Sequence, residues 1–349
     1  LTPVEIAGLE SKNFDAIDAS DDAISLTVAQ ATALGTVTIA AGDAVTIADT
    51  GANIAAMSAV QIAALAASGV DTIDASENAL ALTVAQFEAL GTVTLAAGDT
   101  VTLADTGANL AALTAVEIAA LEGDGIDAVD ASNNALSLTV AQFEALGMVT
   151  LTALDTVTLA DTGANLAALT AVEIAALEGD EVDVIDASDN ALALTVAQFE
   201  ALGTVTLAAG DTVTLADTGA NLGALTAVQI AALAGDGIDT IDASDDAISL
   251  TVAQATALGT VTIAAGDAVT IADTGANIAA MSAVQIAALA AAGVDTIDAS
   301  DDALSLTVAQ ATALGTVTIA AGDAVTIADT GANIAAMSAA QIAALAASG

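Results

Sequence analysis

Carboxylates are the only abundant side chains of this sequence that could carry acid–base or metal chemistry. The chain has 45 Asp and Glu residues against one Lys or Arg, and it has no His and no Cys. The usual ligands of zinc, haem and iron–sulfur clusters and the usual Cys and His nucleophiles are therefore missing. Any catalysis would have to rest on carboxylates, and any metal site would have to use oxygen ligands.

The tripeptide Asp49-Thr50-Gly51 is the most specific catalytic signal in the chain. It matches the active-site loop of aspartic proteases, in which two facing loops place two carboxylates around a shared proton. Here the tripeptide occurs six times in strict tandem, and a tandem array gives no twofold axis that would bring two copies face to face. We therefore expect a turn that enters a loop before a helix, and we expect no enzymatic activity.

Calcium binding is the metal chemistry that the carboxylates favour. Asp side chains and main-chain carbonyls in loops supply the hard oxygen ligands that Ca²⁺ prefers, and two carboxylates about 5 Å apart repel by about 1 to 3 kcal/mol unless a cation offsets them. We predict calcium as the cofactor and three rows of ligands: the Asp18 row (Asp18, Asp74, Asp130, Asp186, Asp242 and Asp298), the Asp43 row (Asp43, Asp99, Asp155, Asp211, Asp267 and Asp323) and the Asp49 row (Asp49, Asp105, Asp161, Asp217, Asp273 and Asp329). The alternative is that these carboxylates are solvated and attract only diffuse cations.

The rows exist because the whole sequence repeats every 56 residues without an insertion or deletion. A strict period of this length is typical of a solenoid, in which each repeat buries its apolar surface against its neighbours. Residues 1–349 are thus predicted to form a single solenoid of six 56-residue repeats plus one extra helix (337–349), cut from a longer array. Equivalent Asp residues should then stack in continuous ladders, about 10 Å apart at every second coil. A fourth row in phase, the Asp15 row, comprises Asp15, Asp71, Asp127, Asp183, Asp239 and Asp295.

Local signals predict the elements that position these side chains. Residues 83–91 and 114–123 each begin with a Thr followed three residues later by Gln or Glu, and each ends at Gly, which is the pattern of a short capped helix. Residues 92–95 and 100–103 alternate Thr with Val or Leu, which predicts half-buried strands separated by a turn at 96–99. The fold class is therefore α/β, an elongated right-handed solenoid with two strand-loop-helix coils per repeat. The recurring Phe of the first helix (Phe87, Phe143 and Phe199) is predicted to be core, and the Asn53 series to satisfy main-chain groups at a bend.

Residues 70–80 carry a resemblance to a known family. Val70, Ile73, Ala75, Asn78 and Leu80 occupy the slots of the pattern LxxLxLxxNxL, so this segment resembles leucine-rich repeats, and the match recurs in all six copies. The resemblance implies leucine-rich-repeat-like coils of strand, loop and helix. The Ala-, Thr- and Asp-rich tandem array is in turn similar to extender regions of large bacterial secreted or surface adhesins, which implies an extracellular or cell-surface location.

Composition excludes some partners and favours others. With one basic residue, the chain has no patch that could track a phosphate backbone, so nucleic acid is excluded. We predict no transmembrane segment, because Thr, Gln and Gly interrupt the uncharged stretch 23–42 and carboxylates recur on both sides of it. We expect a non-enzymatic structural module, namely a spacer, adhesin extender or surface-layer or filament component. Its expected partners are copies of itself or neighbouring repeats, and divalent cations. The alternative is that Thr-x-Thr strands such as 36–38 bind ice or a glycan.

Overall fold

The computed structural model describes residues 1–348 and divides the chain into two compact units. The first unit holds residues 1–161 and 177–185, and the second holds residues 162–176 and those from 186 onward. Both units are built from the same strand–helix repeat.

The second repeat shows the order of elements. Its first coil consists of β5 (Thr72–Ala75), β6 (Ala79–Leu82) and α5 (Val84–Glu88), and its second coil consists of β7 (Thr94–Leu95), β8 (Thr100–Asp105), α6 (Gly107–Ala111) and α7 (Ala115–Ala120). Turns at 76–78 and 96–99 divide the two strands of each coil. The predicted α/β solenoid-like fold, with two coils per repeat, is confirmed.

Parallel sheets of four strands form the framework of each unit. In the first unit these are β2 (Ala23–Leu26), β4 (Ala44–Asp49), β5 and β7, and β6, β8, β9 (Ala128–Ala131) and β11 (Thr150–Leu151), with the pairs β1 (Ala16–Ile17) to β3 (Thr38–Ile39) and β10 (Ala135–Leu138) to β12 (Thr156–Asp161). In the second unit they are β14 (Ala191–Leu194), β16 (Thr212–Asp217), β17 (Thr240–Ala243) and β19 (Thr262–Ile263), then β18 (Ala247–Leu250), β20 (Ala268–Asp273), β21 (Val294–Ala299) and β23 (Thr318–Ile319), and the pair β22 (Ala303–Leu306) to β24 (Ala324–Ile327). The remaining strands are β13 (Val184–Ala187) and β15 (Thr206–Leu207).

Equivalent residues of successive repeats lie in successive sheets, which corrects the predicted continuous ladders. Thr46 pairs with Thr72, and Thr72 pairs with Thr94 in the same sheet. The next copy of Thr46 is Thr102, and it lies in β8 of the following sheet, where it pairs with Ala128. Because β5 and β6 belong to different sheets, each repeat contributes strands to two sheets. A carboxylate row is therefore divided among the sheets.

The helices fall into three classes. Those after the second strand of the first coil are α2 (Val28–Thr32), α5, α8 (Val140–Glu144), α11 (Val196–Glu200), α14 (Val252–Ala257) and α17 (Val308–Ala313). Those at the predicted second helix are α1 (Pro3–Glu10), α4 (Ala59–Ala67), α7, α10 (Ala171–Leu177), α13 (Ala227–Leu233), α16 (Ala283–Leu289), followed by the 3₁₀ turn η1 (Ala290–Ala292), and α19 (Ala339–Ser348), which lies within the predicted extra helix. Those starting at the Gly of Asp-Thr-Gly are α3 (Gly51–Ala55), α6, α9 (Gly163–Ala167), α12 (Gly219–Ala224), α15 (Gly275–Ala279) and α18 (Gly331–Ala335).

The third class was not predicted, because Gly and Asn next to Asp are turn signals. In α6 the hydroxyl of Thr106 accepts a hydrogen bond from the main-chain N–H of Asn109 at 3.3 Å, so Thr106 caps a helix of about one turn. The expected turn is therefore a short helix.

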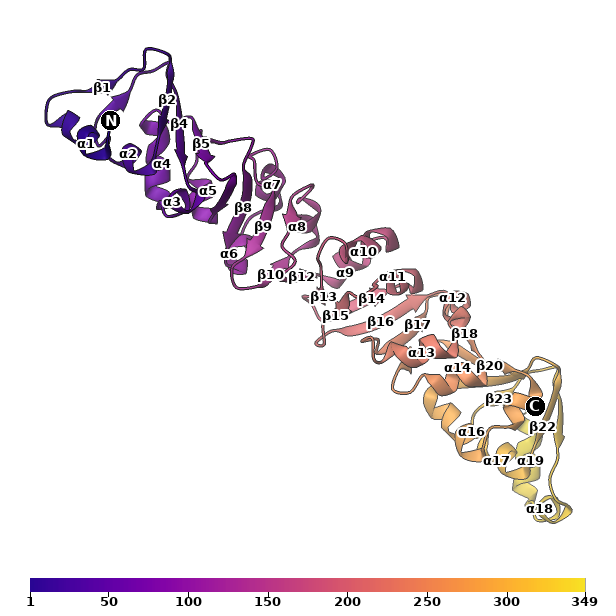
Figure 1. The fold of residues 1–349 in the computed structure, drawn as a ribbon. Helices are drawn as coiled ribbons and strands as arrows, with labels where there is room; N and C mark the ends of the chain where they lie inside the picture. The colour runs from indigo at the N-terminus through magenta and orange to yellow at the C-terminus, as the bar shows by residue number, and fades with distance from the viewer. Residues whose placement is uncertain (349) are drawn as a thin grey trace. The chain divides into compact units, whose positions relative to one another are not determined.

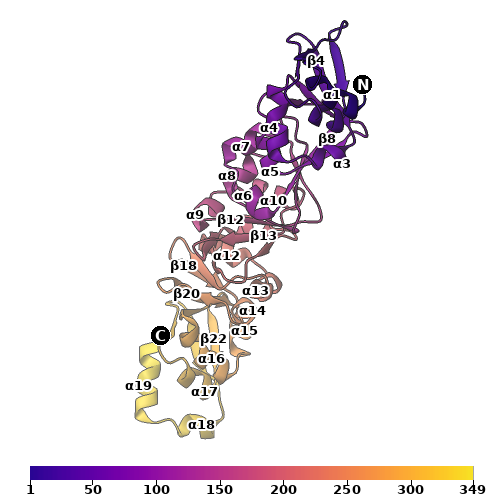
Figure 2. The ribbon, with the colours of Figure 1, turned by 90° about the vertical axis from the view of Figure 1, so that its left-hand side faces the viewer.

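The apolar side chains that alternate with Thr form the core. Leu80, Leu82, Val101 and Leu103 are buried, whereas Thr100 on the opposite face of β8 is exposed. Figure 1 shows the paired strands β4 and β5, and β8 and β9, with short helices at their ends. In Figure 2, α4, α5, α7 and α8 are seen along the same part of the chain, and α4 contacts α5 while α7 contacts α8.

The structure bears on two expectations from the sequence, one about membrane-spanning segments and one about the burial of the Phe side chains. Within residues 1–348, no helix is both long enough and apolar enough to span a bilayer. The three recurring Phe side chains, predicted to be core, are only half-buried. Their rings lie at the surface between coils, where they line grooves described below.

Candidate functional site

The Asp49 row is fully engaged by hydrogen bonds from the protein. In the second repeat, Asp105 Oδ2 accepts from the main-chain N–H of Val84 at 3.1 Å, and Oδ1 accepts from the N–H of Thr106 and the side-chain amide of Asn109, each at 2.7 Å. Val84 is the first residue of α5, so the carboxylate caps a helix of the preceding coil. Asn109 therefore binds a carboxylate, which corrects the prediction that the Asn series satisfies main-chain groups.

These hydrogen bonds set the charge state of the row. Burial alone would raise the pKa of Asp105, but hydrogen bonds from Asn109, Thr106 and Val84 outweigh it and lower the pKa below its ordinary value. The pKa is lowered likewise in Asp49, Asp217, Asp273 and Asp329. A carboxylate that is held ionised by its own scaffold is poorly suited to share a proton, so this geometry differs from the protease-like arrangement that the tripeptide suggests.

The Gly of the tripeptide is required by the next coil. A Cβ on Gly107 would overlap the carbonyl oxygen of Ala135, the first residue of β10. The N–H of Gly107 donates to Asn133 Oδ1 at 2.8 Å in that same coil. The same overlap would arise at Gly51, Gly163, Gly219 and Gly275, whereas no described atom lies within 4 Å of a Cβ at Gly331. Asp105 and Gly107 thus contact neighbouring coils, whereas Thr106 caps the helix of its own coil.

A row that sequence reasoning missed provides the acceptor for this Gly N–H. The side chains are Glu77, Asn133, Asp189, Asp245 and Asp301, which accept from the N–H of Gly51, Gly107, Gly163, Gly219 and Gly275 at 2.7 to 2.8 Å. The residue type varies, so the row does not stand out as a motif. The sequence does contain a signal for this row, because every copy has a side chain with an acceptor oxygen three residues after the Asp of the Asp18 row.

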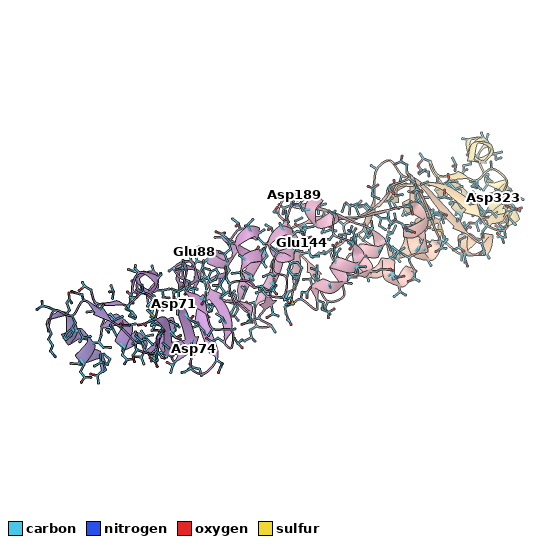
Figure 3. All side chains as sticks on the ribbon, turned by 90° about the horizontal axis from the view of Figure 1, so that it is seen from above. Asp71, Asp74, Glu88, Glu144, Asp189 and Asp323 are labelled. Atoms are coloured by element: carbon cyan, nitrogen blue, oxygen red, sulfur yellow. The ribbon has the colours of Figure 1, made fainter. Side chains whose placement is uncertain are left out.

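The Asp15 row also accepts main-chain N–H groups across coils. Asp71 Oδ2 accepts from Val45 at 2.8 Å, and Asp127 Oδ2 accepts from Val101 at 2.7 Å. Val45 precedes Thr46, at which the pairing of β4 with β5 begins, so the side chain replaces a main-chain acceptor at the edge of the ladder. Asp71 is labelled in Figure 3 together with Asp74, which lies within β5.

The Asp43 row is only half-engaged. Asp99, Asp155 and Asp211 use Oδ2 to accept from the N–H of Ala75, Ala131 and Ala187 at 2.7 to 2.8 Å. Their Oδ1 atoms are buried and have no hydrogen-bond partner among the described residues. Burial, together with the neighbouring carboxylates Asp186 and Asp189, raises the pKa of Asp211 above its ordinary value. The pKa of Asp267 is raised in the same way.

The Asp18 row lies beside the Asp43 row. The hydroxyl of Thr152 is 3.0 Å from Asp130 Oδ1 and 2.9 Å from Asp155 Oδ2, so it joins the two rows. The Asp49 row reaches this corner from the preceding coil, because Asp105 pairs with Ala131, whose N–H is the one that Asp155 Oδ2 accepts. The carboxylate of Asp105 is already used by Val84, Thr106 and Asn109. Of the residues that the structure describes, no three or more acidic side chains form a group that could hold a metal ion by themselves. The calcium ligands stay a prediction.

A buried Gln row completes the contacts between coils. Gln86 Oε1 accepts from the main-chain N–H of Thr83 at 2.8 Å, which closes the predicted capping box. Its Nε2 donates to the carbonyl oxygens of Ala55 at 2.8 Å and Met57 at 2.6 Å in the preceding coil. The sequence predicts the cap but not the second role, because the carbonyl partners lie about thirty residues away.

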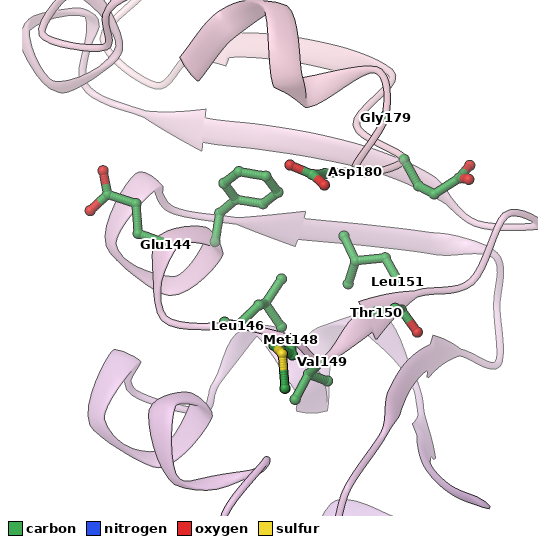
Figure 4. A pocket seen from close by; sticks show the side chains of 11 residues that line it. Glu144, Leu146, Met148, Val149, Thr150, Leu151, Gly179 and Asp180 are labelled. Carbon is green, nitrogen blue, oxygen red and sulfur yellow. The ribbon is translucent and has the colours of Figure 1, made fainter. Parts of the chain in front are cut away.

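Three equivalent grooves open beside the half-buried Phe rings. They measure about 540, 530 and 660 Å³ and are lined by Phe87, Phe143 and Phe199 with neighbouring Leu and Val side chains and acidic residues. Figure 4 shows the second groove, with Asp180 opposite Leu146 and Leu151 and with the carboxylate of Glu144 pointing away from these apolar side chains. The lining offers apolar contacts and carboxylates.

The Thr face of the strands forms short rows. Thr72 and Thr94 have their hydroxyls 3.3 Å apart, and Thr240 and Thr262 have theirs 3.1 Å apart. Since no sheet in the described chain has more than four strands, a Thr row within one sheet is short. No protein-family model and no curated protein matches this chain.

Proposed function

We propose that this chain is a non-enzymatic structural repeat module, a spacer or extender of an extracellular or cell-surface bacterial protein. The observation that carries the proposal is the use of carboxylates between coils. Asp71, Asp99 and Asp105 each accept a main-chain N–H from a neighbouring coil, and the same contacts recur along the chain. The side chains that could perform chemistry are thereby engaged in holding one coil to the next.

The energetics of these contacts support a mechanical role. A hydrogen bond to a charged acceptor contributes about 1.5 to 3 kcal/mol, more than a neutral one. When each coil contacts only its neighbours, total stability is close to a sum over coils and interfaces. A chain of this kind can gain length by adding repeats without redesigning its interior. Partners would then be neighbouring repeats of the same array or copies of the chain.

The negative net charge supports a module that does not adhere to anionic surfaces. The formal net charge of −44 makes copies of the chain repel one another unless divalent cations bridge them, and it disfavours binding to anionic surfaces. An extracellular or cell-surface setting is part of the proposal and draws on composition and on the resemblance to adhesin extenders.

The test is to insert further copies of one 56-residue repeat into the intact chain. Small-angle X-ray scattering should show the maximum dimension growing by a constant increment for each added repeat, and single-molecule pulling should show equal unfolding steps. A maximum dimension that stays constant as repeats are added would contradict a spacer. Both measurements are made with excess EDTA, so that their outcome is independent of bound cations.

A further inference from the structure

The Oδ1 atoms of Asp99, Asp155 and Asp211 are the least satisfied polar atoms found in the described part of the chain. Each is buried and makes no hydrogen bond there, while Oδ2 of the same carboxylate accepts a main-chain N–H. Asp155 exposes only 7% of its surface. A buried carboxylate oxygen without a partner is costly, so its retention in three successive repeats calls for a ligand.

The surroundings of this oxygen are acidic and contain no cation of the protein itself. The only basic side chain is Lys12, in the first repeat. In the Asp155 corner, Thr152 joins Asp155 to Asp130 of the Asp18 row. In the Asp211 corner, Asp186 and Asp189 lie close enough to act on the charge of Asp211.

We propose that the corners of Asp99, Asp155 and Asp211 each bind one calcium ion through the orphan Oδ1 together with an Asp18-row carboxylate. This carboxylate is Asp130 beside Asp155 and Asp186 beside Asp211. Asp74 is assigned to the Asp99 corner by its equivalent position in the 56-residue repeat. Ca²⁺ accepts six to eight oxygen ligands in irregular geometry and takes main-chain oxygens and waters beside carboxylates, whereas Mg²⁺ demands a near-ideal octahedron. Two carboxylates supplemented by neutral oxygens therefore suit Ca²⁺, although no three acidic side chains of the described chain form a site alone. The Asp49 row, which was also predicted to bind calcium, is left out because Asp105 uses both oxygens for hydrogen bonds within the protein.

This inference deepens the proposed function by naming an ion that would tie the coils together, but it is tested separately. Isothermal titration calorimetry of the EDTA-treated and dialysed full chain with CaCl₂, in about 0.15 M NaCl to screen diffuse attraction, is the first measurement. We expect saturable binding and a higher Tm in calcium than in EDTA.

The decisive variant replaces the three orphan carboxylates together: Asp99→Asn, Asp155→Asn and Asp211→Asn. Asn retains one oxygen that can accept the Ala N–H and removes the buried charge, so we expect the variant to fold in EDTA with a Tm equal to or above that of the parent. It should bind one calcium ion fewer for every corner altered and lose most of the calcium-induced rise in Tm. The single Asp155→Asn variant, which should lose one ion, repeats the test with the smallest change.

The matched control is Asp124→Asn, Asp180→Asn and Asp236→Asn, which removes the same charge from exposed carboxylates with the same 56-residue spacing. It should leave the number of bound calcium ions unchanged. Three results would overturn the proposal: no saturable binding, an equal loss of binding in the control, or calcium binding that the corner variants leave intact. None of them bears on the scattering experiment, which is made without calcium.

Discussion

The two ends of strand β8 use the same residue type in different ways. Asp105, at the carboxyl end, receives three hydrogen bonds and its pKa is lowered. Asp99, just before the amino end, receives one from Ala75, and its Oδ1 is buried and finds no partner in the described chain. At the carboxyl end the protein supplies hydrogen bonds to both carboxylate oxygens, whereas at the amino end one carboxylate oxygen has no partner in the described chain. The difference shows that Asp residues that recur at the same spacing can have their oxygens either fully hydrogen-bonded or only partly so.

The largest expected effect comes from the carboxyl end, with Gly107→Ala. The added Cβ would overlap the carbonyl of Ala135, so the coils would have to separate, and we expect a loss of at least about 3 kcal/mol in the free energy of unfolding. Urea unfolding followed by circular dichroism measures it. The control is Gly331→Ala, at the same helix position but with no described atom within 4 Å of the new Cβ, which should change stability by less than about 1 kcal/mol.

A slightly smaller effect is expected from Gln86→Glu, at the start of the helix that Asp105 caps. The carboxylate would keep the capping box but could not donate to the carbonyls of Ala55 and Met57, so we expect a loss of about 2 to 3 kcal/mol. The control is Gln285→Glu in the exposed capping box of α16, where the equivalent residue is already Glu in three copies, at Glu5, Glu117 and Glu173. Equal losses in both variants would show that Nε2 of Gln86 contributes nothing.

The variant Asp105→Ala should lower the free energy of unfolding by about 2 kcal/mol, because the N–H of Val84 at the start of α5 loses its acceptor. In EDTA, Asp99→Asn before the amino end of β8 should reduce the free energy of unfolding far less. The Asp99 carboxylate accepts one hydrogen bond, from the N–H of Ala75, and the side-chain oxygen of Asn can accept it instead. Urea unfolding gives the two free energies, and hydrogen exchange at the Val84 amide should accelerate only in Asp105→Ala. A larger loss in Asp99→Asn would reverse the comparison.

The smallest effect is a pH dependence of opposite sign at the two ends, measured as Tm in EDTA from neutral pH downward. Burial and neighbouring carboxylates raise the pKa of Asp211 and Asp267, so their protonation favours the folded state and Tm should rise as pH falls through that raised pKa toward 3.8. Asp105 and its equivalents Asp49, Asp217, Asp273 and Asp329 have lowered pKa values, so their contribution to stability is complete above 3.8 and is lost as pH falls through the folded-state pKa. The variant Asp211→Asn with Asp267→Asn should lose part of the rise and keep the fall.

Local pattern predicted much of the fold. The alternation of Thr with Val and Leu located β8, and Thr83 with Gln86 located the start of α5, because both signals depend on residues within a few positions of each other. The helix at Gly107 was missed because Gly and Asn favour a turn until a preceding Thr caps them. The continuous ladders were wrong because a period of 56 residues fixes the repeat but not the sheet into which each strand pairs.

The sequence by itself determined the repeat, the α/β class, the capped helices and the excess of carboxylates, since each follows from composition or from neighbours along the chain. Only the tertiary structure decided which carboxylates are satisfied. The partner of Asp105 at Val84 is 21 residues away, that of Asp99 at Ala75 is 24 away, and that of Asp127 at Val101 is 26 away. These pairs meet only when coils stack in one register, so identical Asp residues with identical spacing become a helix cap, a strand-edge acceptor or an open corner according to where the next coil lies.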